Sequence, residues 1–432
     1  MSKKFKRNNL RRETARTPTD KTLVVTIERI VPNGFGIAFA ENLTVFVSLA
    51  VVGDVLRVRV DKLKKNIAFA SIIEIITPSQ NRVSPKCVYF GVCGGCDFQQ
   101  MNYAAQLQAK VDIIKDCLSR IGKIDWQKDI EIIASPREFE YRTRVNWKRD
   151  ESKFGYFKRD SHDICDVEIC PILTEDLQKT LTDLRQDDAI SNSIREIKAV
   201  SSESQISILL DENGNAFDSD ENFYAANFDL SDKAAFEPQS KTARELNLKI
   251  GDFDYAFSAA TFFQVNHQLL QRFIETALQD ASGDFALDLY CGVGLFALPL
   301  SKKFTKVIGI EGSETSINLA KKNAANADLS NADFETASVE SWLTKNVESL
   351  QNVDFILLDP PRTGAERETI DFLCALKPRR IVYVSCNPAT LARDLRLLTA
   401  ENYVIENITA FDFFPQTHHV ETVVSLQKIV NN

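Results

Sequence analysis

The sequence predicts an α/β protein with a C-terminal Rossmann-like domain, an N-terminal β-barrel of the OB type and a central α+β region. From residue 285 onward, apolar segments of strand length end in polar or glycine residues and alternate with helical segments, as in doubly wound sheets. Residues 22–76 contain about five short strands separated by turns, which is typical of a small closed barrel. A glycine-rich loop with three cysteines lies between these regions. The 432 residues suffice for two or three domains, since one core rarely exceeds roughly 250 to 300 residues.

The composition is that of a globular protein rather than a disordered or membrane-embedded one. Hydrophobic residues make up 44% and charged residues 26% of the chain. No apolar run approaches the roughly 18 residues that a membrane span needs, and the basic N-terminus is not followed by an apolar segment, so we expect a cytoplasmic protein without membrane contact. Cysteines in such a protein are metal ligands or catalytic groups more often than disulfides. The net charge of −8 argues against a generally basic nucleic-acid binder, although the positive charge is unevenly distributed.

The first two regions of the chain carry clustered basic residues. Residues 1–21 are predicted to form a disordered basic arm, which either contacts phosphate groups nonspecifically or only keeps the chain soluble. Residues 22–78 are predicted to form the barrel, and Lys62, Lys64 and Lys65 are expected on one of its loops. Barrels of this type commonly bind nucleic acid, but a purely structural accessory barrel is the alternative because a fold does not dictate a function.

A metal site is predicted in the glycine-rich loop. Cys87, Cys93 and Cys96 are separated by five and then two residues, which is ligand spacing. An iron–sulphur cluster or a structural zinc needs a fourth thiolate. The candidates for this ligand are Cys117, Cys165 and Cys170. Cys170 is preferred because it precedes a proline, as ligands do in many cluster sites. Three clustered ligands with one remote cysteine favour a cluster over zinc, and packed cysteines without metal remain an alternative.

The central region, 79–260, is predicted to alternate strands and turns after an amphipathic helix at 101–121. In the segments 141–148 and 154–159, basic residues alternate with aromatic ones. On a strand this alternation would place a row of charge on one face, suited to phosphate groups, with aromatic rings available for base stacking or for the core. Core packing is the commoner fate of such rings.

The C-terminal region, 261–432, is predicted to bind a cofactor at the carboxyl ends of its strands. The strand from Phe285 leads into a glycine turn at 292–294, where a cofactor could approach the backbone at the start of a helix. The second strand ends in Glu311, a carboxylate placed to bind a ribose diol, and the third offers Ser338. A glycine turn alone would also fit a nicotinamide dehydrogenase. An Asp-Pro-Pro-Arg motif after the fourth strand and a thiol after the fifth argue against hydride transfer.

The thiol of Cys386 is the candidate nucleophile. It follows an apolar strand at 380–384 and precedes Pro388, which limits the backbone at the start of a helix. A small buried hydrophobe is the plainer interpretation of a single free cysteine. Glu421 lies next to two of the four histidines and before a valine-rich strand, so it is either a base in a partly buried site or a surface carboxylate. The last two strands are expected to close the sheet as a hairpin.

Several motifs together resemble the RNA uracil-C5-methyltransferase family. They are Phe-Phe-Gln-Val-Asn at 262–266, Asp-Pro-Pro-Arg at 359–362, Ser-Cys-Asn-Pro at 385–388 and His-Val-Glu at 419–421. The barrel resembles a TRAM domain, and the four cysteines resemble the ligands of the iron–sulphur subgroup of this family. The resemblance covers nearly the whole chain from residue 22 and implies that residues 98–129 pack on the methyltransferase domain.

The resemblance also implies roles for individual residues. It makes Cys386 the nucleophile and Glu421 the base of an S-adenosylmethionine-dependent reaction. Gln264 and Asp359 would hold the uracil edge and the methyl donor. The implied cofactor-binding residues are Gln264, Tyr290, Leu295, Glu311, Ser338 and Asp359. The implied ligands of the cluster, expected to be 4Fe-4S, are Cys87, Cys93, Cys96 and Cys170. Leu295 departs from the family pattern because relatives often have Asn there, so a contact at this position would come from the backbone.

The expected substrate also follows from the resemblance. Because this chain has both a predicted barrel and a predicted cluster, it resembles the subgroup of the family that methylates one uracil of 23S rRNA, of the position-1939 type. We therefore expect a monomeric enzyme that binds 23S rRNA and not DNA, with a target base that must leave its stack. The alternatives are another 23S uracil, a tRNA uracil, or a catalytically silent RNA-binding or ribosome assembly factor.

Overall fold

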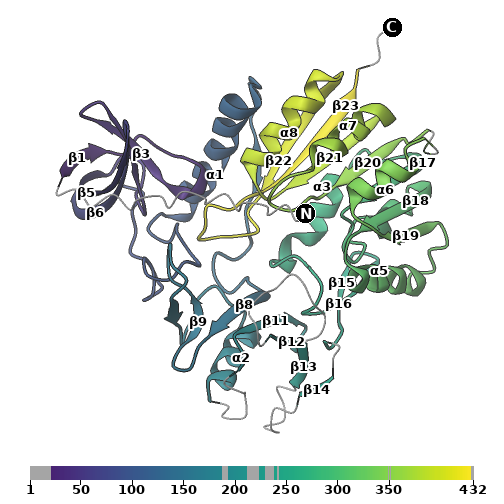
Figure 1. The fold of residues 1–432 in the computed structure, drawn as a ribbon, viewed down its shortest axis with the longest axis horizontal. Coiled ribbons are helices and arrows are strands. Elements are labelled where there is room, and N and C mark those ends of the chain that lie inside the picture. The colour runs from purple at the N-terminus through teal and green to yellow at the C-terminus, as the bar shows by residue number, and fades with distance from the viewer. Residues whose placement is uncertain are drawn as a thin grey trace, which may run out of the picture. The chain divides into compact units, whose positions relative to one another are not determined.

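The computed structural model describes residues 21–186, 193–211, 223–228, 238–240, 243–348, 350 and 352–429. The chain divides into two compact units, residues 1–82 and 83–432, which are described separately (Figure 1). The predicted basic arm lies outside the described residues except for its last position. Among the helices in the described part of the chain, none is long and apolar enough to cross a membrane.

The first unit contains a curled six-stranded sheet in the order β1-β5-β6-β4-β3-β2. Its strands are β1 (Thr22–Thr26), β2 (Arg29–Ile30), β3 (Gly36–Ala40), β4 (Leu43–Val47), β5 (Val55–Lys64) and β6 (Ile67–Thr77). Inward residues of β5 such as Val58 are buried and alternate with exposed ones such as Arg59. One expectation was wrong: Lys62 and Lys64 lie on β5, because this strand continues past its predicted end, and Lys65 alone lies in the turn.

The middle of the chain forms an antiparallel seven-stranded sheet covered by one helix. The strand order is β10-β9-β8-β11-β12-β13-β14. The strands are β8 (Arg144–Arg149), β9 (Phe154–Phe157), β10 (Ile164–Asp166), β11 (Glu196–Ser202), β12 (Gln205–Asp211), β13 (Phe223–Phe228) and β14 (Pro238–Ser240). Helix α2 (Glu175–Gln186) buries Leu177, Leu181 and Leu184 in the same core as Trp147. A separate hairpin follows, made of β15 (Leu246–Ile250) and β16 (Phe253–Phe257).

The largest sheet has eight strands in the order β19-β18-β17-β20-β21-β23-β22-β7. The strands are β17 (Gly283–Leu289), β18 (Phe304–Glu311), β19 (Ala332–Thr336), β20 (Phe355–Leu358), β21 (Arg380–Ser385), β22 (Tyr403–Phe411) and β23 (Glu421–Lys428), with β7 (Glu131–Ile133) at the edge. The strands from β19 to β21 are parallel, and β23 runs antiparallel to both of its neighbours. The predicted terminal hairpin is therefore present.

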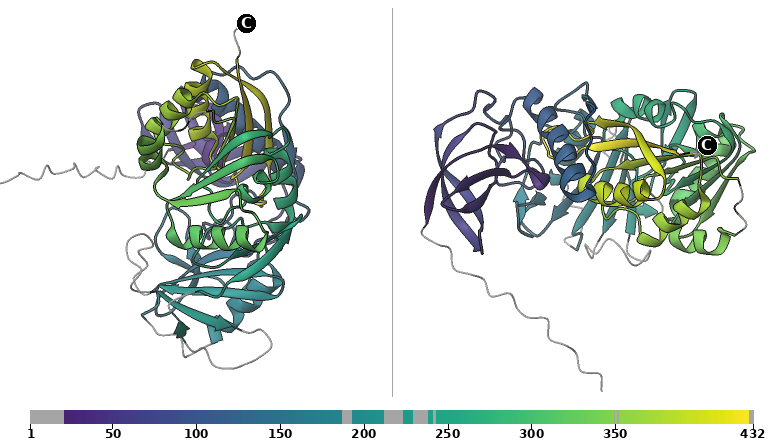
Figure 2. Two further views of the ribbon diagram at one scale, coloured as in Figure 1. Left: turned by 90° about the vertical axis from the view of Figure 1, so that its right-hand side faces the viewer. Right: turned by 90° about the horizontal axis from the view of Figure 1, so that it is seen from above.

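Helices flank this sheet (Figure 2). They are α3 (Leu270–Ala277), α4 (Ala297–Leu300), α5 (Glu314–Asn326), α6 (Val339–Asn346), α7 (Arg367–Leu376) and α8 (Pro388–Ala400). Strands such as β20 are apolar along their whole length because both faces of the sheet are covered.

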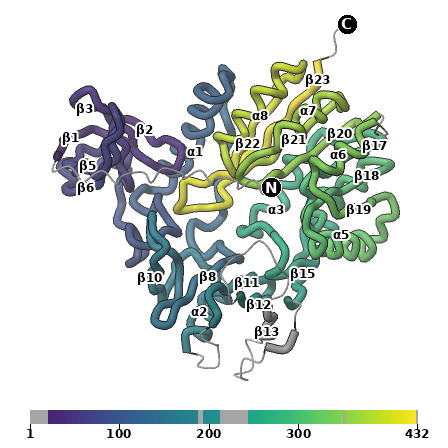
Figure 3. The backbone as a smooth tube through the Cα atoms, viewed as in Figure 1, coloured from purple at the N-terminus to yellow at the C-terminus, as the bar shows by residue number. Residues whose placement is uncertain are grey.

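Two early segments join this C-terminal sheet. Figure 3 shows the blue part of the tube beside its yellow end. Helix α1 (Tyr103–Cys117) packs against α8, and β7 pairs in parallel with β22. The sheet is therefore completed by residues that precede the central sheet in sequence.

Candidate active site

The parallel strands bring the predicted site residues to one edge of the large sheet. Leu289 of β17 lies opposite Leu358 of β20, which lies opposite Tyr383 of β21. Because these strands are in register, the residues that close or follow them meet at the carboxyl edge. These residues are Tyr290, Glu311, Asp359 and Cys386.

Cys386 and Glu421 lie close together at the edge shared by two neighbouring strands. Strand β23 is antiparallel to β21 and their pairing ends with Ser385 opposite Thr422, so Cys386 directly follows the last paired residue of β21 and Glu421 directly precedes that of β23. The charge of Glu421 acts on the Cys386 thiol. The backbone after Cys386 is fixed because the Asn387 side chain caps α8 by accepting from the amide of Ala389 at 3.0 Å. Cys386 is half-buried, whereas Glu421 is only 2% exposed.

The surroundings of both side chains oppose their ionisation in the free protein. Burial, followed by the charges of Glu421 and Asp359, raises the pKa of Cys386 to about 12. Burial and the charge of Asp359 also raise the pKa of Glu421 well above its usual range. The guanidinium of Arg362 opposes both effects by lowering each pKa. A cation brought to this edge would favour the thiolate and the carboxylate.

The turn after β17 provides an open backbone beside Glu311. Tyr290, Gly292 and Gly294 all have positive φ, and a Cβ added to Gly292 would meet no atom of the described residues within 4 Å. The carboxylate of Glu311 accepts from the amide of Gly292 at 3.3 Å and from that of Ser313 at 2.8 Å. The acidic residue predicted to bind a ribose diol therefore lies directly beside the glycine turn.

Other predicted cofactor residues are engaged within the protein. The Ser338 hydroxyl caps α6 by accepting from the amide of Ser341. Tyr290 donates from its hydroxyl to Glu366 at 2.6 Å. The side chain of Leu295 is buried in the core, and its carbonyl accepts from the hydroxyl of Tyr255.

Gln264 lies in a buried segment that β8 and the residues before it hold in place. Its side chain is 4% exposed, and the neighbouring Val265 carbonyl accepts from the Thr143 amide at 2.8 Å. The guanidinium of Arg144 donates to the carbonyl of Ala259 at the start of the same segment. The central sheet thus fixes the backbone that carries Gln264.

Asp288 was missed as a candidate site residue. It lies in β17, is fully buried and has no well-aligned hydrogen bond among the described residues, although the backbone of Ala297 acts to lower its pKa. Burial, then the charges of Asp359 and Glu311, raise its pKa well above the usual range. An acidic residue inside an apolar strand just before a glycine turn was the available signal, since a buried carboxylate needs a partner.

The four predicted ligand cysteines line one cavity in the second unit. Cys87, Cys93 and Cys96 meet Cys170 there, and the side chains of Arg142 and Tyr156 complete its wall. The alternative Cys117 is buried in α1, away from this cavity. The alternative Cys165 does not line the cavity, but its buried thiol lies beside that of Cys93. Within the described residues, no group of three or more His, Cys, Asp or Glu side chains is arranged to hold a single metal ion.

The barrel presents aromatic rings beside a basic residue. Phe46 and Phe69 are stacked with centroids 5.4 Å apart, and Phe35 contacts both rings edge-on. Phe69 is 37% exposed, and Lys62 lies opposite it in register and is also exposed. Because paired residues share one face of a sheet, the amine and the rings lie on the same outer surface.

Comparisons with known proteins cover nearly the whole chain. A family model described as tRNA (uracil-5-)-methyltransferase matches residues 102–429, and a TRAM domain model matches residues 19–73. The chain is 31% identical over 437 residues to the 23S rRNA (uracil(1939)-C(5))-methyltransferase RlmD of Pectobacterium atrosepticum, covering 96% of both proteins. It is 32% identical over 423 residues to an uncharacterized RNA methyltransferase of Aquifex aeolicus, covering 94% of this chain and 99% of that one.

A solved structure is similar over most of the chain as well. The Pyrococcus abyssi tRNA (uracil-54, C5)-methyltransferase in complex with S-adenosyl-L-homocysteine aligns with a TM-score of 0.70 at 26% identity. The alignment covers 94% of this chain and all of that one.

Proposed function

We propose, from the premise that this chain belongs to the tRNA (uracil-5-)-methyltransferase family, that it methylates carbon 5 of one uracil in 23S rRNA. The methyl donor is S-adenosylmethionine. The observation that carries the proposal is the pair of Cys386 and Glu421 at the carboxyl edge of the sheet. The near full-length likeness to a named 23S rRNA enzyme, together with the TRAM match, supports rRNA as the substrate.

Cys386 activates the base by temporary covalent attachment. Carbon 5 of uracil is a poor nucleophile, so the Cys386 thiolate adds to carbon 6 and the displaced electron pair forms an enolate through carbon 4 and its oxygen. This makes carbon 5 nucleophilic toward the electrophilic methyl group that S-adenosylmethionine supplies when bound. Glu421 then accepts the proton from carbon 5, and the resulting enolate expels the Cys386 thiolate and restores the ring.

Buried carboxylates at the sheet edge fit a cationic methyl donor. Burial and the charge of Asp359 raise the pKa of Asp288 and that of Glu421, and burial raises the pKa of Asp359 to about 7. A sulphonium or ammonium group here would offset their burial and lower the pKa values of Cys386 and Glu421. Glu311 would hold the ribose diol. The remaining proposed cofactor residues are Gln264, Tyr290, Leu295 and Ser338.

The four-cysteine cavity would hold an iron–sulphur cluster. Four thiols line one cavity, yet no three ligand side chains in the described part of the chain are arranged around a single ion. A cluster distributes its four thiolates over several iron atoms, whereas one zinc draws its ligands to about 2.3 Å from a single point. The half-buried Arg142, whose side chain lines the same cavity as the thiols, would offset the negative charge of such a cluster. None of the steps above needs electron transfer, so the proposed role of the cluster is to stabilise the fold or to order the RNA.

The substrate base must leave its stack to reach Cys386, at a cost of a few kcal/mol, so loops or refolded single strands of rRNA are favoured. The exposed rings of the barrel offer a surface for neighbouring bases. A ribosomal RNA substrate would also locate the enzyme in the cytoplasm.

A tRNA uracil is the second candidate because the P. abyssi structure, with its TM-score of 0.70, is described as a tRNA enzyme. The test offers the purified protein unmodified 23S rRNA and unmodified tRNA in competition, with donor labelled in its methyl group. Label at one rRNA uracil would support the proposal. Label in tRNA alone would overturn the substrate but leave the chemistry, and label in neither RNA would overturn the function.

A further inference from the structure

The loop at 412–420 joins β22 to β23 and leads directly into Glu421. It contains no helix or strand, and connecting loops are usually mobile and exposed. This loop is different because most of its residues are buried. Asp412, Phe413 and Val420 are fully buried, and Gln416 is 2% exposed. Its backbone must therefore be held by specific partners.

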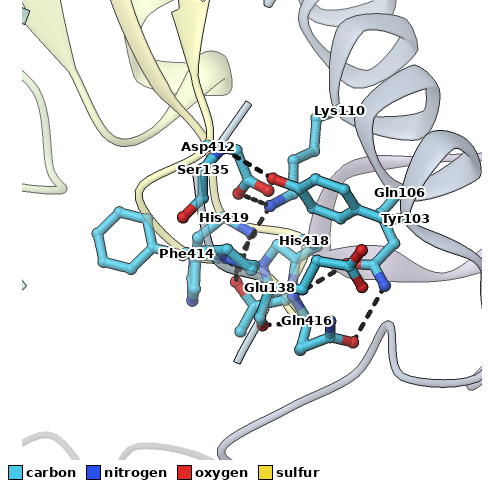
Figure 4. Close-up of polar contacts among 12 residues, drawn as sticks. Tyr103, Gln106, Lys110, Ser135, Glu138, Asp412, Phe414, Gln416, His418 and His419 are labelled. Atoms are coloured by element: carbon cyan, nitrogen blue, oxygen red, sulfur yellow. Dashed lines mark hydrogen bonds and ion pairs between the residues drawn. The ribbon is translucent and has the colours of Figure 1, made fainter. Parts of the chain in front are cut away.

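The first partner is Lys110 of α1. Its ammonium group forms an ion pair with Asp412 and donates to the Phe414 carbonyl at 3.0 Å (Figure 4). Neither charged side chain is exposed to solvent. Lysine is almost never fully buried unless it is paired, and buried ion pairs fix a particular geometry more than they add stability.

The second partner is Gln106, one helical turn before Lys110 on α1. Its side-chain oxygen accepts from the Gln416 amide at 2.9 Å, and its side-chain nitrogen donates to the Gln416 side chain at 3.0 Å. Gln416 has a φ of 69°, a left-handed conformation that residues other than glycine seldom adopt. The paired hydrogen bonds hold this turn of the loop.

The third partner is Asp97, which follows Cys96. The Asp97 carboxylate accepts from the His418 amide at 2.8 Å and also contacts the His418 ring. In return, the amides of Asp97 and Phe98 donate to the Gln416 carbonyl. The loop is therefore tied on one side to α1 and on the other to the segment after the cysteines.

Glu421 is held on one side by the pairing of β23 with β22 and on the other by this loop, which ends at Val420. One of its carboxylate oxygens has no hydrogen-bond partner among the described residues, and the residue is the first of its strand. We infer that Gln106 and Lys110 are positioning residues for Glu421. This inference rests on the proposed function, in which Glu421 must come within hydrogen-bond reach of carbon 5, and a displacement of about 1 Å can cost a hundredfold in rate.

Loss of the contacts that hold the loop at 412–420 should slow one step of the reaction more than the others. Thiol addition and methylation precede removal of the carbon 5 proton, so a displaced Glu421 slows the last step alone. The methylated adduct between Cys386 and ordinary uridine RNA would then accumulate. A merely structural role would instead lower every step in proportion to the folded fraction.

The experiment compares Gln106→Ala with the double variant Lys110→Met/Asp412→Asn. The double variant removes both charges together, so it does not leave one charge buried and unpaired. Gln108→Ala is the matched control, because Gln108 is exposed on the same helix and its side chain donates to Asp112 rather than to the loop. The readout is the denaturant-stable protein–RNA complex and its methyl content, with KM for RNA and the rate of release.

We expect about a tenfold slower release and a matching gain of methylated complex in both test variants, with KM unchanged and the control like wild type. Wild-type release and complex levels in the two test variants, or a parallel fall of methylation and complex, would overturn the inference. A wild-type protein that methylates neither rRNA nor tRNA would overturn the proposed function, and the inference with it.

Discussion

The thiol of Cys386 lies where its ionisation is disfavoured until ligands arrive. Its raised pKa reflects burial and the nearby carboxylates of Glu421 and Asp359, while Arg362 acts in the opposite direction. A nucleophile of this kind stays protonated in the free protein and becomes reactive when a cation enters the site. Under the proposed function, these four side chains would couple binding of a cationic donor to ionisation of the Cys386 thiol.

Replacement of the nucleophile gives the first prediction. Cys386→Ala should abolish the covalent complex with RNA that carries 5-fluorouridine, because fluorine at carbon 5 cannot be removed as a proton and the wild-type adduct is trapped. Gel shift under denaturing conditions measures the complex. Cys374→Ala, a change in α7 away from the site, is the control and should trap normally. Trapping that survives in Cys386→Ala would exclude this residue as the nucleophile.

The pH dependence gives the second prediction. Cys386 and Glu421 both have raised pKa values and both act deprotonated, so the rate of adduct formation and release should increase from about pH 6 to about pH 9. Arg362 lowers both pKa values, so Arg362→Gln should shift the rate profile toward higher pH.

The control for this shift is Arg367→Gln, an exposed arginine that pairs with Asp371 on the surface of α7. Stopped reactions at constant ionic strength measure the two profiles. A profile of Arg362→Gln that coincides with that of wild type would mean that this guanidinium does not act on the reacting groups.

The positions of Cys386 and Glu421 in the fold were the part of the candidate site that could best be predicted from the sequence. Cys386 and Glu421 stand at strand ends that apolar patterns locate well, and register then brings them together. Lys110 and Asp412 could not be predicted in the same way. They are 302 positions apart, and no local pattern distinguishes a lysine that will be buried from one on a solvated helix face.

At the scale of elements, the cysteine loop gives the third prediction. Cys170→Ser should lower the iron and acid-labile sulphide bound by the anaerobically purified protein, because it removes one of the four proposed ligands. It should also lower the melting temperature, since the loop and the Cys170 segment would lose their common anchor. Cys117→Ser, within α1, is the control. Equal iron content in both variants, or zinc in place of iron, would contradict the cluster.

The outer face of the barrel gives the fourth prediction. Phe46→Ala combined with Phe69→Ala should weaken binding of an rRNA fragment by about tenfold or more, since stacking of one base on an aromatic ring contributes about 1–3 kcal/mol. Phe39→Ala is the control because this ring is 55% exposed but makes no ring contact with the other three. Fluorescence anisotropy at fixed salt measures affinity, and equal affinities would assign the barrel a structural role.

Long strands with a continuous apolar pattern were predicted better than short strands, or parts of strands, that depend on a neighbouring strand. The parallel strands of the large sheet are continuous apolar segments, and their order follows from doubly wound topology. Strand β7, at 131–133, carries too short a pattern to be recognised and is a strand only because the edge of β22 accepts it. The continuation of β5 through Lys62 and Lys64 was missed because alternating basic residues read equally well as a polar loop.

At the scale of the whole molecule, selectivity for one RNA cannot come only from the residues at the carboxyl edge of the large sheet. The chemistry at Cys386 would serve any accessible uracil, so the choice of RNA must rest on surfaces distant in sequence. The TRAM unit, the cysteine cavity and the central sheet all precede the residues that react. Under the proposed function, we expect these parts of the chain to make the extended contacts that discriminate an rRNA substrate from other RNAs.

The central claim is that this chain methylates one uracil of 23S rRNA, and mapping of 5-methyluridine by mass spectrometry tests it most directly. The measurement compares 23S rRNA and tRNA from cells with the gene, without it, and with a Cys386→Ala copy. We predict loss of methylation at a single 23S uracil in the latter two strains. Unchanged rRNA with loss of a tRNA methyl group would contradict the claim.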